Sequence, residues 1–129
     1  MTQATPTDDI LFTRQGRIGL VTLNRPAALN ALNRTMCVAL HRQLMDWAVD
    51  DAVEAVVVEG AGGRAFCAGG DVVGLHRDGL AGSPDWEGFF HDEYRMNQAI
   101  AHYPKPYVAL VDGISMGGGV GISVHAPFR

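Results

Sequence analysis

Two short apolar segments, each followed directly by a glycine-rich stretch, constrain this chain most. Residues 53–59 (VEAVVVE) and 107–111 (YVALV) are rich in β-branched residues, and glycines crowd residues 60–71 and 112–121. Continuous apolar runs of this length are typical of strands buried on both faces of a parallel sheet. The carboxyl ends of parallel strands share one edge of the sheet, where α/β proteins bind ligands. We therefore expect the two glycine-rich stretches to converge at one site, the first as a loop and the second as the start of a further helix.

The segments around these strands predict a single α/β domain over residues 1–129. Residues 10–14 and 17–23 read as a hairpin around Gln15 and Gly16. Apolar residues recur at helical spacing over residues 33–50, with Asn33 as the N-cap, and over residues 86–102. A strand, a helix and a second strand form the unit of a parallel layer with a right-handed crossover.

Composition and charge exclude several classes of protein. Ten basic and 14 acidic residues give a net charge of −4 without a run of Lys or Arg, so nucleic acid is not an expected partner. The apolar runs fall far short of the ~20 residues that a bilayer crossing needs. The first nine residues lack a secretory signal, and a cytoplasmic location is expected. Cys37 and Cys67 lack metal-ligand spacing, so we expect reduced thiols and no metal.

Two catalytic or binding motifs match in part. Residues 60–65 (GAGGRA) fit the dinucleotide-binding fingerprint, but the following residues 66–70 (FCAGG) are poor helix formers, which disfavours that interpretation. Residues 113–117 (GISMG) fit the serine-hydrolase pattern around Ser115. Such an enzyme needs an acid and a histidine after the serine, whereas only His125 follows. A small turn residue is the favoured interpretation of Ser115, and a serine esterase remains an alternative.

Taken together, the two glycine-rich stretches favour a different chemistry. Glycine lets the main chain approach a ligand closely, and backbone N–H groups from two loops can donate to one oxygen. Such an oxyanion hole stabilises an enolate or a tetrahedral oxyanion formed at a carbonyl or thioester.

Four separated segments carry a family resemblance. In chain order they are LNRP (23–26), NALN (30–33), AFCAGGD (65–71) and the segment from Lys105-Pro106 to the glycine triplet (105–119). Together they resemble the crotonase superfamily of enoyl-CoA hydratases and isomerases. Residues 89–94 (FFHDEY) and 113–125 are similar to its 3-hydroxyisobutyryl-CoA hydrolase branch.

This resemblance implies a fold and an activity. The fold is α/β, a crotonase-like spiral of ββα units, usually assembled into homotrimers or hexamers. The activity is hydrolysis of a short 3-hydroxyacyl-CoA thioester, 3-hydroxyisobutyryl-CoA, as in valine degradation. Coenzyme A enters as part of the substrate, and no other cofactor is implied. An enoyl-CoA hydratase or isomerase is the first alternative, and a non-catalytic CoA-binding protein is another.

The resemblance also assigns site residues. The backbone N–H groups of Ala68 and Gly118 form the oxyanion hole, and Glu93 meets the substrate hydroxyl or orients water. An ordinary solvated helix glutamate is the alternative for Glu93. The residues implied around the substrate and CoA are Arg25, Ala28, Ala68, Gly69, Gly70, Asp71 and Gly117. Asp71 is expected to cap the segment after it, and Cys67 to pack rather than attack, because no histidine is placed to activate it.

The chain departs from the family pattern at two positions. Gly121 stands where the hydratases carry a catalytic glutamate, which disfavours hydration. Ala27 stands where many relatives have a lysine facing the coenzyme phosphates. Two alternatives follow: a weaker affinity for CoA, or positive charge supplied by Arg25 and Arg64 instead.

The resemblance further implies that the domain is incomplete at its carboxyl end. Relatives run on for at least as long again, with a further catalytic glutamate and an aspartate downstream. We therefore expect the 129 residues alone to show little or no hydrolase activity and to associate through uncovered apolar surface.

Overall fold

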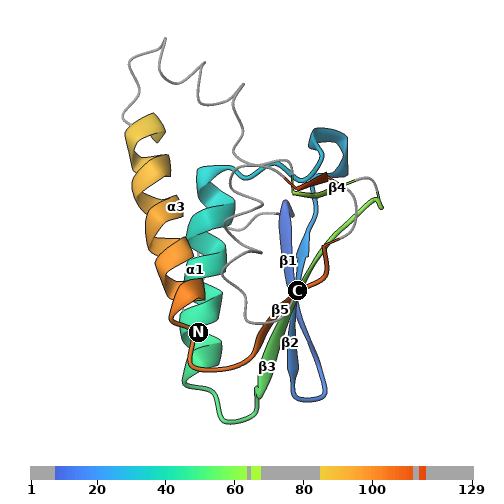
Figure 1. The fold of residues 1–129 in the computed structure, drawn as a ribbon, viewed down its shortest axis with the longest axis vertical. Coiled ribbons are helices and arrows are strands. Elements are labelled where there is room, and N and C mark those ends of the chain that lie inside the picture. The colour runs from blue at the N-terminus through green and yellow to red at the C-terminus, as the bar shows by residue number, and fades with distance from the viewer. Residues whose placement is uncertain (1–7, 64, 68–84, 112–113, 116–129) are drawn as a thin grey trace.

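A four-stranded mixed sheet forms one layer of the molecule (Figure 1). The computed structural model describes residues 8–63, 65–67, 85–111 and 114–115. Strands β1 (Ile10–Gln15) and β2 (Ile18–Leu23) form an antiparallel hairpin, and β3 (Ala55–Gly60) and β5 (Tyr107–Ala109) continue parallel to β2 in the order β1-β2-β3-β5. The predicted hairpin is confirmed, and Gly16 takes the left-handed φ of +61° that its tight turn requires.

Two helices cover one face of this sheet (Figure 1). Helix α1 (Arg34–Ala48) follows β2, and helix α3 (Asp85–Ala101) precedes β5. Both lie where the apolar periodicity predicts them. Asn33 caps α1 as predicted, because its side-chain oxygen accepts a hydrogen bond from the backbone N–H of Met36 at 2.9 Å. The start of α1 is tied to α3 by the Arg34 guanidinium, which lies 2.7 Å from the Asp92 carboxylate.

The core lies between the sheet and the two helices. Strand residues that point toward the helices are buried, and they pack against the apolar stripes of both helices. These residues are Ile10, Val21, Leu23, Val56, Val58, Tyr107 and Ala109 from the sheet and Met36, Leu40, Leu44, Trp47, Phe89, Met96 and Ile100 from the helices. Gly19 makes room for the Trp47 ring, since a Cβ at Gly19 would come within 2.6 Å of it.

The opposite face of the sheet is less buried than the sequence predicts. In β3, Val56 and Val58 are buried, whereas Ala55 and Val57 are only partly buried. The expectation of burial on both faces is wrong for the described part of the chain, because α1 and α3 lie on the same side of the sheet. Within the described residues, no helix is long and apolar enough to span a membrane.

Two very short strands lie beyond the carboxyl ends of β3 and β5. Strands β4 (Ala65–Cys67) and β6 (Ile114–Ser115) pair in parallel as a separate two-stranded sheet. The sequence predicts a loop and the start of a helix for these segments. Glycines flank both strands, so neither shows an alternating or continuous apolar pattern of the length by which a strand is predicted. The extended backbone of β4 and β6 depends on the pairing of these two strands with each other.

Candidate functional site

The two glycine-rich stretches meet at β4 and β6. Ala65 pairs with Ile114 and Cys67 pairs with Ser115, so the segments after β3 and β5 lie side by side at the carboxyl ends of the parallel strands. The predicted convergence of the two stretches is therefore confirmed as far as these strands reach. Six predicted site residues follow β4 or β6 in the chain and lie outside the described residues: Ala68, Gly69, Gly70, Asp71, Gly117 and Gly118.

A compact turn after β2 borders the same end of the molecule. Helix η1 (Pro26–Ala28) is a single 3-10 turn, and Ala28 donates its N–H to the Arg25 carbonyl at 2.9 Å. The Arg25 guanidinium is mostly buried. It donates to the Ala31 carbonyl at 2.7 Å and lies 3.9 Å from the Asp9 carboxylate. The guanidinium of Arg25 thus holds the turn together, a role that is not predicted from the sequence.

Asn30 sits at the centre of this turn and is almost fully buried, with 1% of its surface exposed. Its side-chain oxygen accepts a hydrogen bond from the Arg25 N–H at 2.8 Å. Its amide nitrogen donates to the carbonyls of Ala61 and Ala65, both at 2.9 Å. The sequence presents Asn30 only as the first residue of the NALN motif, and its role in this turn is not predicted from it. A polar side chain in a short turn between apolar elements is the signal that points to such a role.

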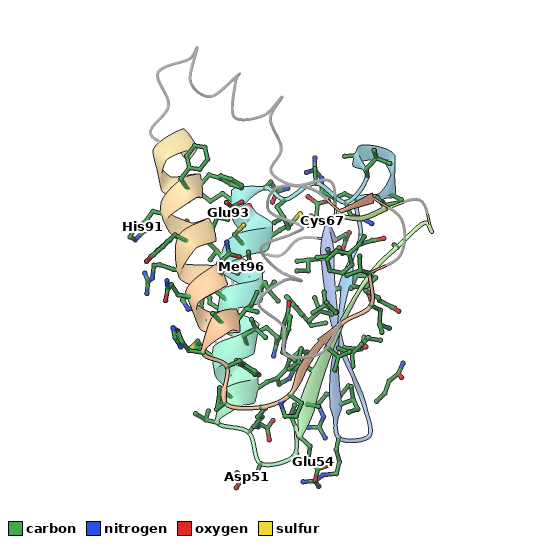
Figure 2. The ribbon with its side chains drawn as sticks, viewed as in Figure 1. Asp51, Glu54, Cys67, His91, Glu93 and Met96 are labelled. Carbon is green, nitrogen blue, oxygen red and sulfur yellow. The ribbon has the colours of Figure 1, made fainter. Side chains whose placement is uncertain are left out.

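Glu93 lies on α3 and faces the interior of this end. Figure 2 shows Glu93 and Met96 on the side of α3 toward α1 and the sheet, at the level of Cys67, whereas His91 points away. Glu93 is half-buried, and burial raises the pKa of its carboxyl. The thiol of Cys37 on α1 has its pKa raised strongly, first by burial and next by the negative charge of Glu93. The Glu93 carboxyl is therefore partly shielded from solvent, in contrast to a fully exposed helix glutamate.

The two candidate nucleophiles have different surroundings. Cys67 is fully buried within β4, which favours the packing role predicted for it. Ser115 belongs to β6 and pairs with Cys67. In a serine hydrolase the nucleophile sits on a sharp turn between strand and helix. The residues after Ser115 lie outside the described part of the chain, so the argument against a serine esterase remains the one from the sequence, which has no acid after Ser115.

A groove of about 620 Å³ runs between the outer surfaces of α1 and α3. It is lined by Arg34, Val38, His41, Arg42, Met45, Asp46, Asp92 and Arg95. Of the implied site residues that the structure describes, Arg25, Ala28 and Glu93, none lines this groove. Across the described parts of the chain, no three His, Cys, Asp or Glu side chains are grouped so that they would hold a metal ion.

Comparison with known proteins places this chain among relatives that act on CoA thioesters. Residues 18–129 match the enoyl-CoA hydratase/isomerase family. A mitochondrial 3-hydroxyisobutyryl-CoA hydrolase of Xenopus tropicalis is 51% identical over 130 residues, which cover 100% of this chain and 34% of the relative. The corresponding enzyme of Danio rerio is 49% identical over 121 residues, or 94% of this chain and 32% of the relative. The chain thus spans about a third of the length of these curated relatives.

Two further matches are a relative with a different name and, separately, a protein of known structure. The small ribosomal subunit protein mS47 of Neurospora crassa is 45% identical over 125 residues, covering 95% of this chain and 25% of the relative. The crystal structure of a carnitinyl-CoA dehydratase from Mycobacterium thermoresistibile superposes with a TM-score of 0.92 at 46% identity, covering 95% of this chain and 36% of that one. This likeness confirms the predicted crotonase-like α/β fold.

The comparison also corrects one expectation. A cytoplasmic location was expected from the first nine residues, but the hydrolases of Xenopus tropicalis and Danio rerio are both named as mitochondrial. The expectation is wrong because it used only the lack of a secretory signal. That lack does not distinguish the cytosol from an organelle.

Proposed function

Because this chain belongs to the enoyl-CoA hydratase/isomerase family, we propose that it supplies the thioester-binding part of an acyl-CoA hydrolase. The proposed substrate is a short 3-hydroxyacyl-CoA, specifically 3-hydroxyisobutyryl-CoA, which places the reaction in valine degradation. The observation that carries the proposal is the pairing of β4 with β6, since it joins the two segments from which the backbone donors would come. The names of the Xenopus tropicalis and Danio rerio relatives support the choice of substrate.

In the proposed reaction, the thioester oxygen accepts hydrogen bonds from the backbone N–H groups of Ala68 and Gly118. Water adds its oxygen to the thioester carbon, and negative charge develops on the thioester oxygen, where the two donors stabilise it. The C–S bond then breaks, and coenzyme A leaves as the thiol after taking up a proton. The other product is the 3-hydroxy acid. Coenzyme A thus enters as part of the substrate and is released as a product, and no further cofactor takes part.

Glu93 is the proposed group that meets the substrate hydroxyl or orients the attacking water. A half-buried carboxyl with a raised pKa can exchange a proton closer to neutral pH than an exposed glutamate can. Its position level with β4 in Figure 2 supports this role. We further propose that Arg25, Ala28, Gly69, Gly70, Asp71 and Gly117 surround the substrate and that the complete protein is a homotrimer or hexamer.

The experiment is a thioester assay on two proteins. One is the 129-residue chain, and the other is this chain continued with the residues that follow the matched region in the Xenopus tropicalis hydrolase. A thiol reagent measures coenzyme A release from a panel of acyl-CoAs. We expect release from 3-hydroxyisobutyryl-CoA by the extended chain and little or none by the 129 residues alone. Comparable rates in both proteins would contradict the proposed dependence on downstream residues.

The first alternative is an enoyl-CoA hydratase or isomerase, which the name of the Mycobacterium thermoresistibile neighbour favours. The sequence argues against it, because Gly121 has no carboxylate to activate water for addition to a double bond. Loss of crotonyl-CoA absorbance measures hydration directly. Hydration of crotonyl-CoA that is faster than thioester hydrolysis would replace the hydrolase proposal with this alternative.

The second alternative is a protein without catalysis, which the similarity to the ribosomal protein mS47 favours. Such a protein would keep the fold and either bind an acyl-CoA without turnover or not bind it at all. Equilibrium binding of a 3-hydroxyacyl-CoA, together with a complete lack of coenzyme A release by the extended chain, would support this alternative over the hydrolase.

A further inference from the structure

We infer that Asn30 is a positioning residue for the thioester-binding segment, acting through the start of β4. The inference rests on the proposed function, because the donor that Asn30 would help to position is the backbone N–H of Ala68. Asn30 does not touch the proposed substrate oxygen. It holds the strand that ends one residue before that donor.

The hydrogen bonds of Asn30 bridge segments that are far apart in the chain. Its nitrogen donates to the Ala61 and Ala65 carbonyls, which stand at the two ends of the turn between β3 and β4, and its oxygen accepts from the Arg25 N–H. An amide offers both a donor pair and an acceptor, and all three contacts use the matching group. Asn30 therefore closes the β3–β4 turn and fastens it to the turn after β2.

The surrounding backbone is shaped for this contact. A Cβ at Gly60 would lie 2.6 Å from the Phe66 carbonyl oxygen and 2.9 Å from the Asn30 amide nitrogen, so only glycine lets β4 and Asn30 pack so closely. Leu29 and Asn30 have φ values of +53° and +58°, and asparagine is among the residues that tolerate this left-handed region. The N–H of Asn30 also donates to the Arg25 carbonyl at 2.8 Å, which fixes the turn.

The contacts of Asn30 affect the proposed site because the residues of β4 are covalently joined to the segment that carries the first donor. Ala65 begins β4 and pairs with Ile114, and Cys67 pairs with Ser115. Ala68, which carries the first proposed donor, is joined directly to Cys67 in the chain. Releasing the Ala65 carbonyl therefore loosens the anchor of the segment that carries the first proposed donor. A catalytic donor misplaced by about an ångström loses much of its effect.

The test compares two identical chemical changes three residues apart. Asn30→Asp keeps the acceptor for the Arg25 N–H but turns the amide nitrogen into an oxygen that faces two carbonyls. Asn33→Asp keeps the helix cap but loses the 3.0 Å donation from Asn33 to Asp9, so it is the matched control away from β4. Both are made in the 129-residue chain, and circular dichroism checks that each variant folds.

The first measurement needs no ligand and follows hydrogen exchange of the β4 amides. We expect Asn30→Asp to speed exchange at Phe66 and Cys67 by on the order of tenfold or more, which corresponds to the loss of one or two buried hydrogen bonds, and Asn33→Asp to leave it unchanged. Unchanged exchange at β4 in Asn30→Asp would overturn the inference whatever the protein binds.

The second measurement reads the oxyanion hole itself. The probe is dimethylaminocinnamoyl-CoA, an acyl-CoA whose thioester carbonyl is conjugated with an aromatic ring. It absorbs at longer wavelength when hydrogen-bond donors polarise this carbonyl. We expect the wild-type chain and Asn33→Asp to shift this absorbance and Asn30→Asp to bind with similar affinity without the shift. A full shift in Asn30→Asp would overturn the inference. If the wild-type chain binds this acyl-CoA without any shift, the oxyanion-hole proposal fails first, and the inference for Asn30 fails with it.

Discussion

At the scale of single residues, Lys105 is the clearest case of one side chain joining several segments. Its ammonium donates to the carbonyls of Trp47, Asp50 and Val53 at 2.5–2.7 Å, so its three N–H donors are all used. These carbonyls belong to the end of α1 and the turn before β3, where helix carbonyls lack partners and attract a positive charge.

Replacing Lys105 with methionine should therefore destabilise the chain by about 2 kcal/mol, the typical value for hydrogen bonds from a charged group. The free energy of unfolding, measured in urea, checks this. Arg42→Met is the matched control, since it removes a positive charge from the exposed surface of α1, and we expect it to cost less than about 0.5 kcal/mol. Equal losses in the two variants would show that charge, and not the three contacts of Lys105, matters.

Replacing the Glu93 carboxyl should lower the activity of the protein and raise its stability at neutral pH. Glu93→Gln should lower hydrolysis by the extended chain about 100-fold, because the acid-base group is lost. Burial raises the pKa of Glu93, so the folded chain holds this proton more tightly than the unfolded chain does. The resulting stability is present at acidic pH and is lost as pH rises above the ordinary glutamate value. Glu93→Gln should thus melt at a higher temperature than wild type at pH 7, and the difference should vanish at about pH 4. A lower melting temperature at pH 7 would contradict this assignment.

At the scale of whole elements, the contact between β2 and α1 depends on a missing side chain. A Cβ at Gly19 would come within 2.6–2.8 Å of three ring carbons of Trp47, which is buried and makes an edge-on contact with Phe12. Gly19→Ala should therefore cost about 1–3 kcal/mol in unfolding free energy through overpacking. The same substitution made in a Trp47→Leu background should cost clearly less. An equal cost in both backgrounds would mean that the ring is not the obstacle.

Tyr103 provides a second link between elements, with a pH signature. Its hydroxyl, in the connection from α3 to β5, donates to the Leu44 carbonyl of α1 at 2.7 Å, and burial raises its pKa to about 12. Because the folded pKa is above the unfolded value of about 10, the stability that this group contributes is lost as pH rises from 10 to 12. Tyr103→Phe should be less stable by about 1 kcal/mol at pH 7 and should lose less stability than wild type over that alkaline range. Parallel alkaline losses in the two proteins would contradict this.

Some of these elements can be predicted from the sequence, and others cannot. The hairpin, both helices and the parallel strands β3 and β5 follow from apolar runs, helical periodicity, turn residues and the Asn33 cap, because those signals are local. β4 and β6 do not follow, since these short segments stand among glycines without a run of β-branched residues of their own and are defined by their pairing with each other. The meeting of the two glycine-rich stretches was predictable because each of them follows a strand of the same sheet. The role of Asn30 was not, since it depends on which distant carbonyls lie within its reach.

At the scale of the molecule, one face of the sheet has no cover from the helices of the described chain. Leu20, Val57 and Val108 form a row across three strands on this face, and Leu11 and Leu110 beside it are 39% and 51% exposed. β5 also has only β3 as a neighbour among the described strands, so its other backbone edge is unpaired there. Contiguous apolar surface and an open edge both favour association.

We therefore expect the 129-residue chain to self-associate in sedimentation experiments over a range of concentrations. Leu11→Lys combined with Leu110→Lys should reduce association at little cost in stability, because both side chains are already exposed. Val49→Lys, at a position that is 83% exposed at the end of α1, is the control and should leave association unchanged. A monomeric wild-type chain at all concentrations would contradict the expectation.

The order of the strands in the sheet also bears on how the molecule is made. From one edge to the other the order is β1, β2, β3 and β5, which is the order of the chain itself. During synthesis from the amino terminus, each new strand therefore meets its neighbour already formed, and no strand has to insert between two others. The hairpin, α1 and β3 can come together while the ribosome is still adding α3. Lys105 emerges after all three of the carbonyls that it binds, so its contacts form only once this first part has taken shape.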